Sequence, residues 1–161
     1  MGAVLIFCGC EYEAPLTKEH SVAVDSSVLG LWELIPDAGE EKEKKEWMMV
    51  LKYSGTEYMI HYPIGDDAMY FRAYPIKIGE VQCVQLQAIG THEGPPDKGE
   101  KNLYHVASYR LNGAKLEIKL LNADLVDDEL KTSAALTRSF QKHKGNKNLF
   151  INPGTFRRVE K

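Results

Sequence analysis

The chain has 161 residues, 43% of them hydrophobic, and a formal net charge of −3. This length predicts a single domain that can bury a core without disulfides. The small net charge and the lack of a basic stripe argue against a nucleic-acid partner. After the first residues no apolar run approaches the ~20 residues of a membrane-spanning helix.

The first ten residues, Met-Gly-Ala-Val-Leu-Ile-Phe-Cys-Gly-Cys, are apolar and end in a small residue and Cys10; polar residues begin at Glu11. This order is similar to a bacterial lipoprotein signal. The resemblance implies that residues 1–9 are a partial signal peptide, that Cys10 is acylated, and that the lipids anchor the protein to a membrane. Because Glu rather than Asp follows the cysteine, it also implies an outer-membrane protein facing the periplasm. The alternative is a frayed apolar tail or a short strand over the core, since the run is short and lacks a preceding basic residue.

Residues 10–24 show no sustained period and are predicted to be a flexible tether. A domain is then expected over 25–161. Asp25-Ser26-Ser27 offers an N-cap for one helical turn, residues 30–35 follow as a first strand, and residues 36–46 form a charged loop.

Alternating apolar residues and turn signals predict a run of further strands. Ser54-Gly55 and Asn112-Gly113 are the turn signals, and the second is the strongest hairpin signal in the chain. The expected strands are 47–53, 57–62, 69–78, 81–89, 103–111 and 115–121.

The period changes near residue 124. Acidic residues at 127–129, basic residues at 142–144 and Gly145 predict a helix over 124–144. Val126, Leu130 and Phe140 recur at helical spacing and give it one apolar stripe. A last short strand is expected over 155–159.

These elements predict a mainly β fold: an antiparallel up-and-down meander of seven or eight strands with one helix before the last strand. Closure into a barrel is the simplest way to remove the open sheet edges. A half-open, strongly twisted sheet wrapped on the helix is the alternative.

At this point the chain resembles the lipocalin-like (calycin) domains of bacterial lipoproteins. The matching residues are Gly30 and Trp32, which form a Gly-x-Trp motif after a helical turn, and a basic residue on the last strand, Arg157 or Arg158. The resemblance implies that this arginine packs across the tryptophan ring at the closed end of the barrel. That role is structural, so none of these residues is a predicted site. The middle and late motifs of full lipocalins are not recognisable.

The sequence gives no sign of catalysis, a cofactor or a metal centre. Its five histidines lie on different predicted elements and show no metal-ligand spacing (His20, His61, His92, His105 and His143). Cys8 and Cys10 lack the further ligands that zinc needs. No nucleophile elbow, phosphate loop or zinc motif occurs. The protein is therefore expected not to be an enzyme, and Cys83 is expected to be a small buried group.

Aromatic residues are concentrated on the middle strands, and five of them are candidates for the wall of a ligand pocket inside the barrel: Tyr58, Tyr62, Phe71, Tyr74 and Tyr104. An eight-stranded barrel is just wide enough for one small ligand or for a core of side chains. Two functions follow. One is a lipid-anchored protein that binds a small apolar or amphipathic ligand; the alternative is an envelope adaptor, assembly factor or inhibitor with a filled barrel and a protein partner.

Overall fold

The computed structural model describes residues 11–40, 44–99 and 103–160. The predicted signal peptide at 1–9 and the lipidation residue Cys10 lie outside these described residues. The described chain contains a 3-10 turn η1 (Ser26–Val28), eight strands and a helix α1 (Ser133–His143). The strands are β1 (Gly30–Ile35), β2 (Trp47–Lys52), β3 (Tyr58–His61), β4 (Met69–Ile78), β5 (Val81–Thr91), β6 (Tyr104–Asn112), β7 (Lys115–Leu121) and β8 (Phe150–Arg158).

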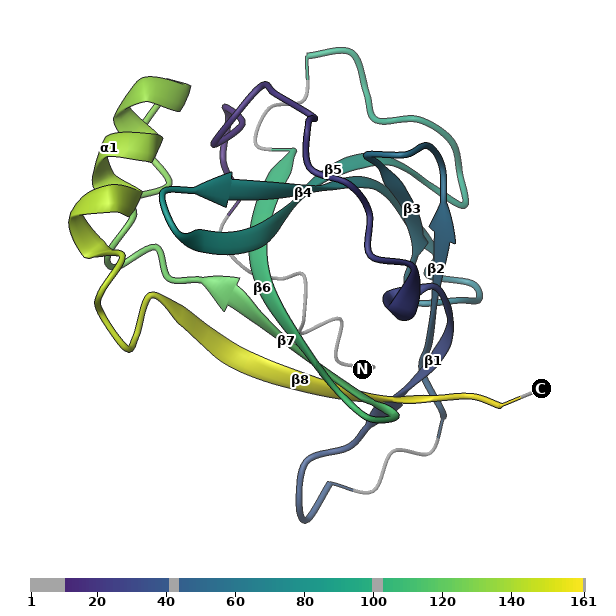
Figure 1. Cartoon of the computed structure of the whole chain (residues 1–161). Helices are drawn as coiled ribbons and strands as arrows, with labels where there is room; N and C mark the ends of the chain where they lie inside the picture. Colours follow the sequence, from purple (N-terminus) through teal and green to yellow (C-terminus); the bar gives the residue numbers. More distant parts are fainter. Residues whose placement is uncertain (1–10, 41–43, 100–102, 161) are drawn as a thin grey trace.

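The strands form one closed barrel in chain order, with each strand antiparallel to the next (Figure 1). β1 closes the ring against β8, in register from Trp32 opposite Arg158 to Ile35 opposite Thr155. The predicted meander of eight strands with one helix before the last is confirmed. The half-open sheet is excluded, because pairing of the first and last strands leaves no open edge.

The tight hairpin between β6 and β7 shows how the local sequence sets the register. Asn112 pairs with Lys115, so Gly113 and Ala114 are the loop residues between β6 and β7. Gly113 has φ +59°, a conformation that glycine adopts at little cost. The hairpin predicted at Asn112-Gly113 is present, with its two-residue loop one position later.

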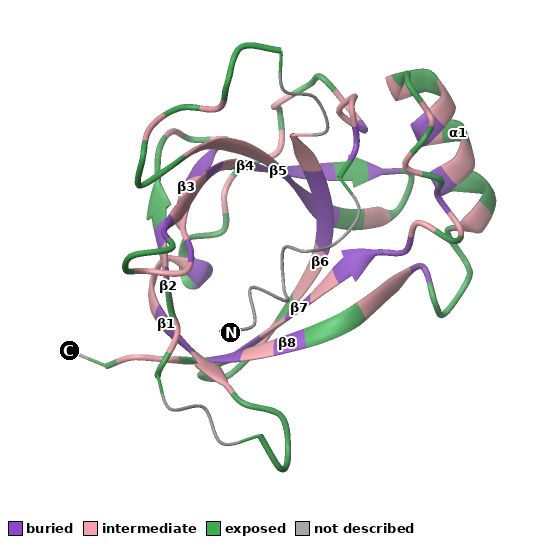
Figure 2. Cartoon of the chain, turned by 180° about the vertical axis from the view of Figure 1, so that it is seen from behind, coloured by how far each residue is buried: buried purple, intermediate pink, exposed green. Residues whose placement is uncertain are grey.

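α1 lies outside the barrel wall (Figure 2), and in this part of the barrel both faces of the wall carry packed side chains. Inside, the core gathers around Trp32, Phe71 and Phe156, which are fully buried. Outside β4 to β7 a second hydrophobic cluster lies beneath the N-terminal segment and α1. Strand alternation alone cannot tell these two faces apart, because apolar residues point in both directions.

Residues 11–25, which we call the strap, differ from the expected flexible tether. Tyr12 is 2% exposed and Leu16 is 3% exposed, and both belong to the outer cluster. Tyr12 exchanges backbone hydrogen bonds with Tyr104 of β6, and its hydroxyl donates to the Val126 carbonyl at 2.8 Å. The strap has no regular period because single side chains, rather than one repeating face, bind it to the barrel.

The helix is shorter than its sequence pattern predicted. It begins at Ser133 rather than at residue 124, and the Thr132 side chain caps it by accepting from Ala135 N. Val126 is buried ahead of the helix, so part of the apparent stripe came from a packed loop. The last strand begins at Phe150 rather than at 155. Within the described ranges, no helix has both the length and the apolar character needed to cross a bilayer.

Candidate functional site

Trp32 of β1 and Arg158 of β8 are in contact across the strand pair that closes the barrel. The guanidinium carbon of Arg158 lies 4.3 Å from the centre of the indole ring. The same guanidinium donates to the carbonyls of Leu29, at 2.8 Å, and of Ser27. The indole N–H donates to the Val28 carbonyl at 2.9 Å, which fixes η1 over the barrel end. The arginine–tryptophan contact expected from the resemblance is thus present, and Arg158 makes it.

Arg157 takes a different direction and pairs with Glu33 on β1. Glu33 also accepts from Lys45 Nζ and from the Trp47 indole N–H, each at 3.3 Å. Hydrogen bonds from Arg157 and Trp47 lower the pKa of Glu33 below its usual value. Arg157 and Arg158 are neighbours on β8 but contact different clusters, because alternate side chains of a strand point to opposite faces.

The barrel interior is almost filled by its own side chains. The cavity that remains has a volume of about 40 Å³ and a largely apolar wall. A cavity that binds benzene needs about 150 Å³, whereas one water molecule needs about 10–15 Å³. The lining residues are Val28, Met48, Val50, Tyr58, Ile60, Val84, Leu86, Ala107, Tyr109, Leu116 and Ile118.

Tyr58 and Tyr109 bring hydroxyls to this otherwise apolar wall. Asp25 N donates to Tyr58 Oη at 2.6 Å, and the two tyrosine hydroxyls are hydrogen-bonded to each other. Burial raises the pKa of both phenols, so they stay neutral and act as hydrogen-bonding groups at ordinary pH. The pair joins the strap to the barrel wall next to the cavity.

The five residues predicted to line a pocket fall into two groups. Tyr58, Tyr62 and Phe71 point into the barrel core, and Tyr58 alone of the five lines the cavity. Tyr74 and Tyr104 point outward into the cluster beneath the strap. The cavity lining that the sequence reasoning missed is mostly aliphatic, and ordinary core alternation was its only signal.

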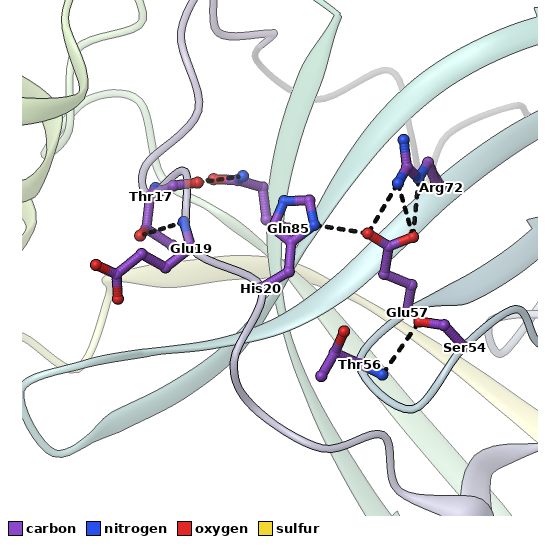
Figure 3. Close-up of polar contacts among 8 residues, drawn as sticks. All are labelled: Thr17, Glu19, His20, Ser54, Thr56, Glu57, Arg72 and Gln85. Atoms are coloured by element: carbon purple, nitrogen blue, oxygen red, sulfur yellow. Dashed lines mark hydrogen bonds and ion pairs between the residues drawn. The ribbon is translucent and has the colours of Figure 1, made fainter.

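A polar cluster outside the barrel holds the strap in place (Figure 3). Gln85 is fully buried on β5, and its amide accepts from Leu16 N at 2.5 Å and donates to the Thr17 carbonyl at 3.0 Å. On α1, Thr137 Oγ1 donates to the Leu16 carbonyl at 2.8 Å. Buried backbone groups need such partners, so Gln85 substitutes for a missing strand neighbour.

Farther along the strap, His20 Nδ1 lies 2.6 Å from Glu57 Oε1 (Figure 3). Arg72 donates to both oxygens of Glu57 at 2.8–2.9 Å. The His20 ring stacks on Tyr74 at 3.6 Å. Burial raises the pKa of Glu57, but the bonds from Arg72 and His20 outweigh it and leave that pKa below its usual value. This geometry keeps the carboxylate charged and holds the middle of the strap on the barrel.

Neither a family model, nor a curated protein, nor a solved structure matches this chain.

The outer face of β2 is left uncovered by the strap and α1. Met48 and Val50 point into the barrel, so Trp47, Met49 and Leu51 point outward. Among the described residues, the large hydrophobic side chains with high exposure are Trp47 at 41%, Leu51 at 51% and Tyr53 at 61%. Leu51 pairs with Met59 of β3 on the same face. We call Trp47, Met49, Leu51, Tyr53 and Met59 the outer patch.

The remaining candidate groups are buried or distant from one another. His105 points into the barrel, and burial lowers its pKa to about 4. His61 stacks on Tyr70 on the outer face. Cys83 is buried, and burial raises the pKa of its thiol to about 12. No group of three or more metal-ligating side chains occurs in residues 11–40, 44–99 and 103–160.

Proposed function

We propose that this chain is a lipid-anchored cell-envelope protein, not an enzyme, that acts through the surface of a filled barrel. Its role is that of an adaptor, assembly factor or inhibitor with a protein partner. Cys10 carries the lipids, and the outer membrane facing the periplasm is the proposed location. The observation that carries the proposal is the filled interior, because a cavity of about 40 Å³ has no room for an amphipathic ligand.

The outer patch supports a surface role. Leu51 and Tyr53 expose more than half of their side chains, and Trp47 exposes two-fifths. Contiguous apolar surface of this kind is characteristic of protein–protein contacts when it is rimmed by polar groups. Here Arg72 lies over the Tyr53 ring at one side, at 5.7 Å, and the Glu33 cluster lies beside Trp47 at the other. Aromatic and arginine side chains of this type often dominate binding energy.

A site-specific photo-cross-link tests the partner face. A photoreactive phenylalanine replaces Leu51 in the acylated protein in native membranes, and the same group replaces Arg110, which is exposed on β6, as a control. We expect one discrete protein adduct from position 51 and none from position 110. The adduct from position 51 should disappear when Trp47 and Tyr53 are changed to serine. No discrete adduct, or equal adducts from both positions, would contradict the proposal.

Mass spectrometry of the natively expressed protein tests the anchor independently. We expect a mature chain that begins at Cys10 and carries several acyl chains. An intact leader with an unmodified Cys10 would exclude the anchor and the location, whatever the outcome of cross-linking.

Binding of a small apolar ligand is the second candidate function. The observation that favours it is the apolar cavity between β2, β3 and β5–β7, which a ligand could enlarge by displacing side chains such as Met48. Native mass spectrometry after gentle purification would then show a bound molecule of constant mass. If no molecule is bound, the result would support the filled barrel that acts through its surface.

A further inference from the structure

Positive charge is concentrated in the last part of the chain. Residues 131–158 contain seven lysines and arginines and no aspartate or glutamate. The whole chain has a net charge of −3, so the other residues together carry −10. Arg157 pairs with Glu33, Arg158 packs over Trp32, and Lys131 pairs with Glu13 at 3.0 Å.

The other four cations lie on α1 and the turn that follows it. Arg138, Lys142, Lys144 and Lys147 are exposed, and none of them forms an ion pair with another described residue. We call these four residues the basic face of α1. The helix buries its opposite side, through Leu136 and Phe140, in the outer cluster. The helix is therefore fixed to the barrel while its cations point to solvent.

A groove beside the basic face has the chemistry of a phosphate site. It lies between α1 and the strap and is lined in part by Lys18, Ser133, Thr137 and Arg138. Ser133 Oγ is buried and has no hydrogen-bond partner within the described part of the chain. Two cations and a hydroxyl suit a phosphate oxygen, and Glu19 is the one acid in the lining.

The strap sets the distance between this surface and a membrane, if Cys10 carries lipids as proposed above. Tyr12 is buried and bonded to Val126, and Leu16 is bonded to Thr137 of α1. Only Glu11 separates Cys10 from Tyr12, and two residue steps of extended chain span at most about 7 Å. A lipid-anchored barrel therefore has no long linker and must lie close to the bilayer on the side of the strap.

Acidic residues near α1 do not neutralise all of the basic face. Glu129 precedes the helix and Lys144 follows it, so an 11-residue helix about 16 Å long lies between them in the chain. That length exceeds the screening distance of about 10 Å at 0.1 M salt. Asp124 lies nearer to Lys147, because Asn122 bonds both Asp124 N and the Asn148 carbonyl. Arg138, Lys142 and Lys144 are thus the residues on which the inference depends.

We propose that the basic face of α1 binds the headgroups of anionic phospholipids. This deepens the proposed function, because it sets the orientation of the anchored barrel. α1 and β2 lie on opposite sides of the barrel (Figures 1 and 2). With α1 on the bilayer, the outer patch on β2 faces away from the membrane and is open to a protein partner.

Sedimentation with vesicles tests the proposal on the full chain with Cys10→Ser, which cannot be acylated. The vesicles contain 30% phosphatidylglycerol in phosphatidylcholine, or phosphatidylcholine alone. The test variant is R138Q/K142Q/K144Q. The control is K52Q/K98Q/K115Q, which changes three other exposed lysines and gives the same net charge. Circular dichroism and melting temperature establish that both variants are folded.

We expect salt-sensitive binding to the anionic vesicles that exceeds binding to neutral vesicles. A lysine near an anionic surface contributes about 1 kcal/mol, or about fivefold in affinity. R138Q/K142Q/K144Q should therefore bind at least tenfold more weakly, and the control should change less than about threefold. Equal binding to both vesicle types, or equal loss in the two variants, would overturn the proposal. Binding of the basic face to a protein or a polynucleotide, without binding to anionic vesicles, would also overturn the proposal. Mass spectrometry of the natively expressed protein measures the acylation of Cys10 separately. Failure of the anchor and failure of lipid binding are therefore distinguishable.

Discussion

The guanidinium of Arg158 lies over the indole of Trp32, with its carbon 4.3 Å from the ring centre. The two residues are also directly opposed across the closing pair of strands, β1 and β8. One contact therefore joins the first strand, the last strand and η1. Barrel closure depends on residues that lie 126 positions apart in the sequence, so long-range tertiary contacts determine it.

Arg158→Ala should destabilise the barrel by about 2 kcal/mol. It removes a cation–π contact of about 0.5–2 kcal/mol and two hydrogen bonds of about 1 kcal/mol each, partly replaced by water. Urea unfolding measures the change. Arg157→Ala is the matched control and should cost less than about 1 kcal/mol, since Arg157 is more than half exposed and Lys45 and Trp47 still bind Glu33. Equal costs would contradict the assigned roles.

Gln85→Leu should loosen the strap without opening the barrel. The change leaves the buried Leu16 N–H without its partner, at a cost of about 1–3 kcal/mol. Hydrogen exchange should show faster exchange at residues 16–20 and little change in β1 to β3. Gln82→Leu, at an exposed position of the same strand, is the control and should leave strap exchange unchanged.

His105 should make the protein less stable below pH 6.5. Burial lowers its pKa to about 4 in the folded chain, so in that range the unfolded chain binds a proton that the folded chain does not. Stability is therefore lost as pH falls from 6.5 to about 4, by an amount on the order of 3 kcal/mol. His105→Gln should flatten this part of the stability profile, whereas His92→Gln, at an exposed site, should not. A profile unchanged by His105→Gln would show that another group titrates there.

Glu57 should make the stability of the protein depend on pH in a lower range than His105 does. Its pKa in the folded chain lies below the ordinary 4.5, so its contribution is complete above that pH and is lost as pH falls through the folded value. The stability gap between wild type and Glu57→Gln should be constant from pH 7 to 5 and narrow below about 4.5. Unfolding at a series of pH values measures it, with the highly exposed Glu80→Gln as control. A gap that widens on acidification would contradict the geometry of Arg72, His20 and Glu57.

Val84→Ile should be tolerated because Val84 lines the cavity. One added methylene filling empty space contributes up to about 0.8 kcal/mol of stability. Val106→Ile, which adds the same group at a buried position outside the cavity, should cost about 1 kcal/mol by overpacking. Equal destabilisation by both changes would indicate that the interior has no usable space at all.

The sequence by itself determined the class of fold and most of its elements. Alternation with period two, the turn at Gly113 and the single helical stripe specify local conformation, and the strands over 69–78 and 115–121 were predicted with the bounds that the structure shows. These signals are local because they arise from backbone geometry and turn chemistry within a few residues. The resemblance around Trp32 also predicted an arginine–tryptophan contact, which Arg158 makes across the closing strand pair.

Only the tertiary structure decided which side of each strand faces the core. Tyr74 and Tyr58 share the same chemistry and alternation, yet one lies outside under the strap and the other inside. The strap itself carries no periodic signal, because Gln85, Glu57 and Tyr104 bind it one contact at a time from distant parts of the chain. The volume left inside depends on how all the side chains pack together, and no single segment of sequence records it.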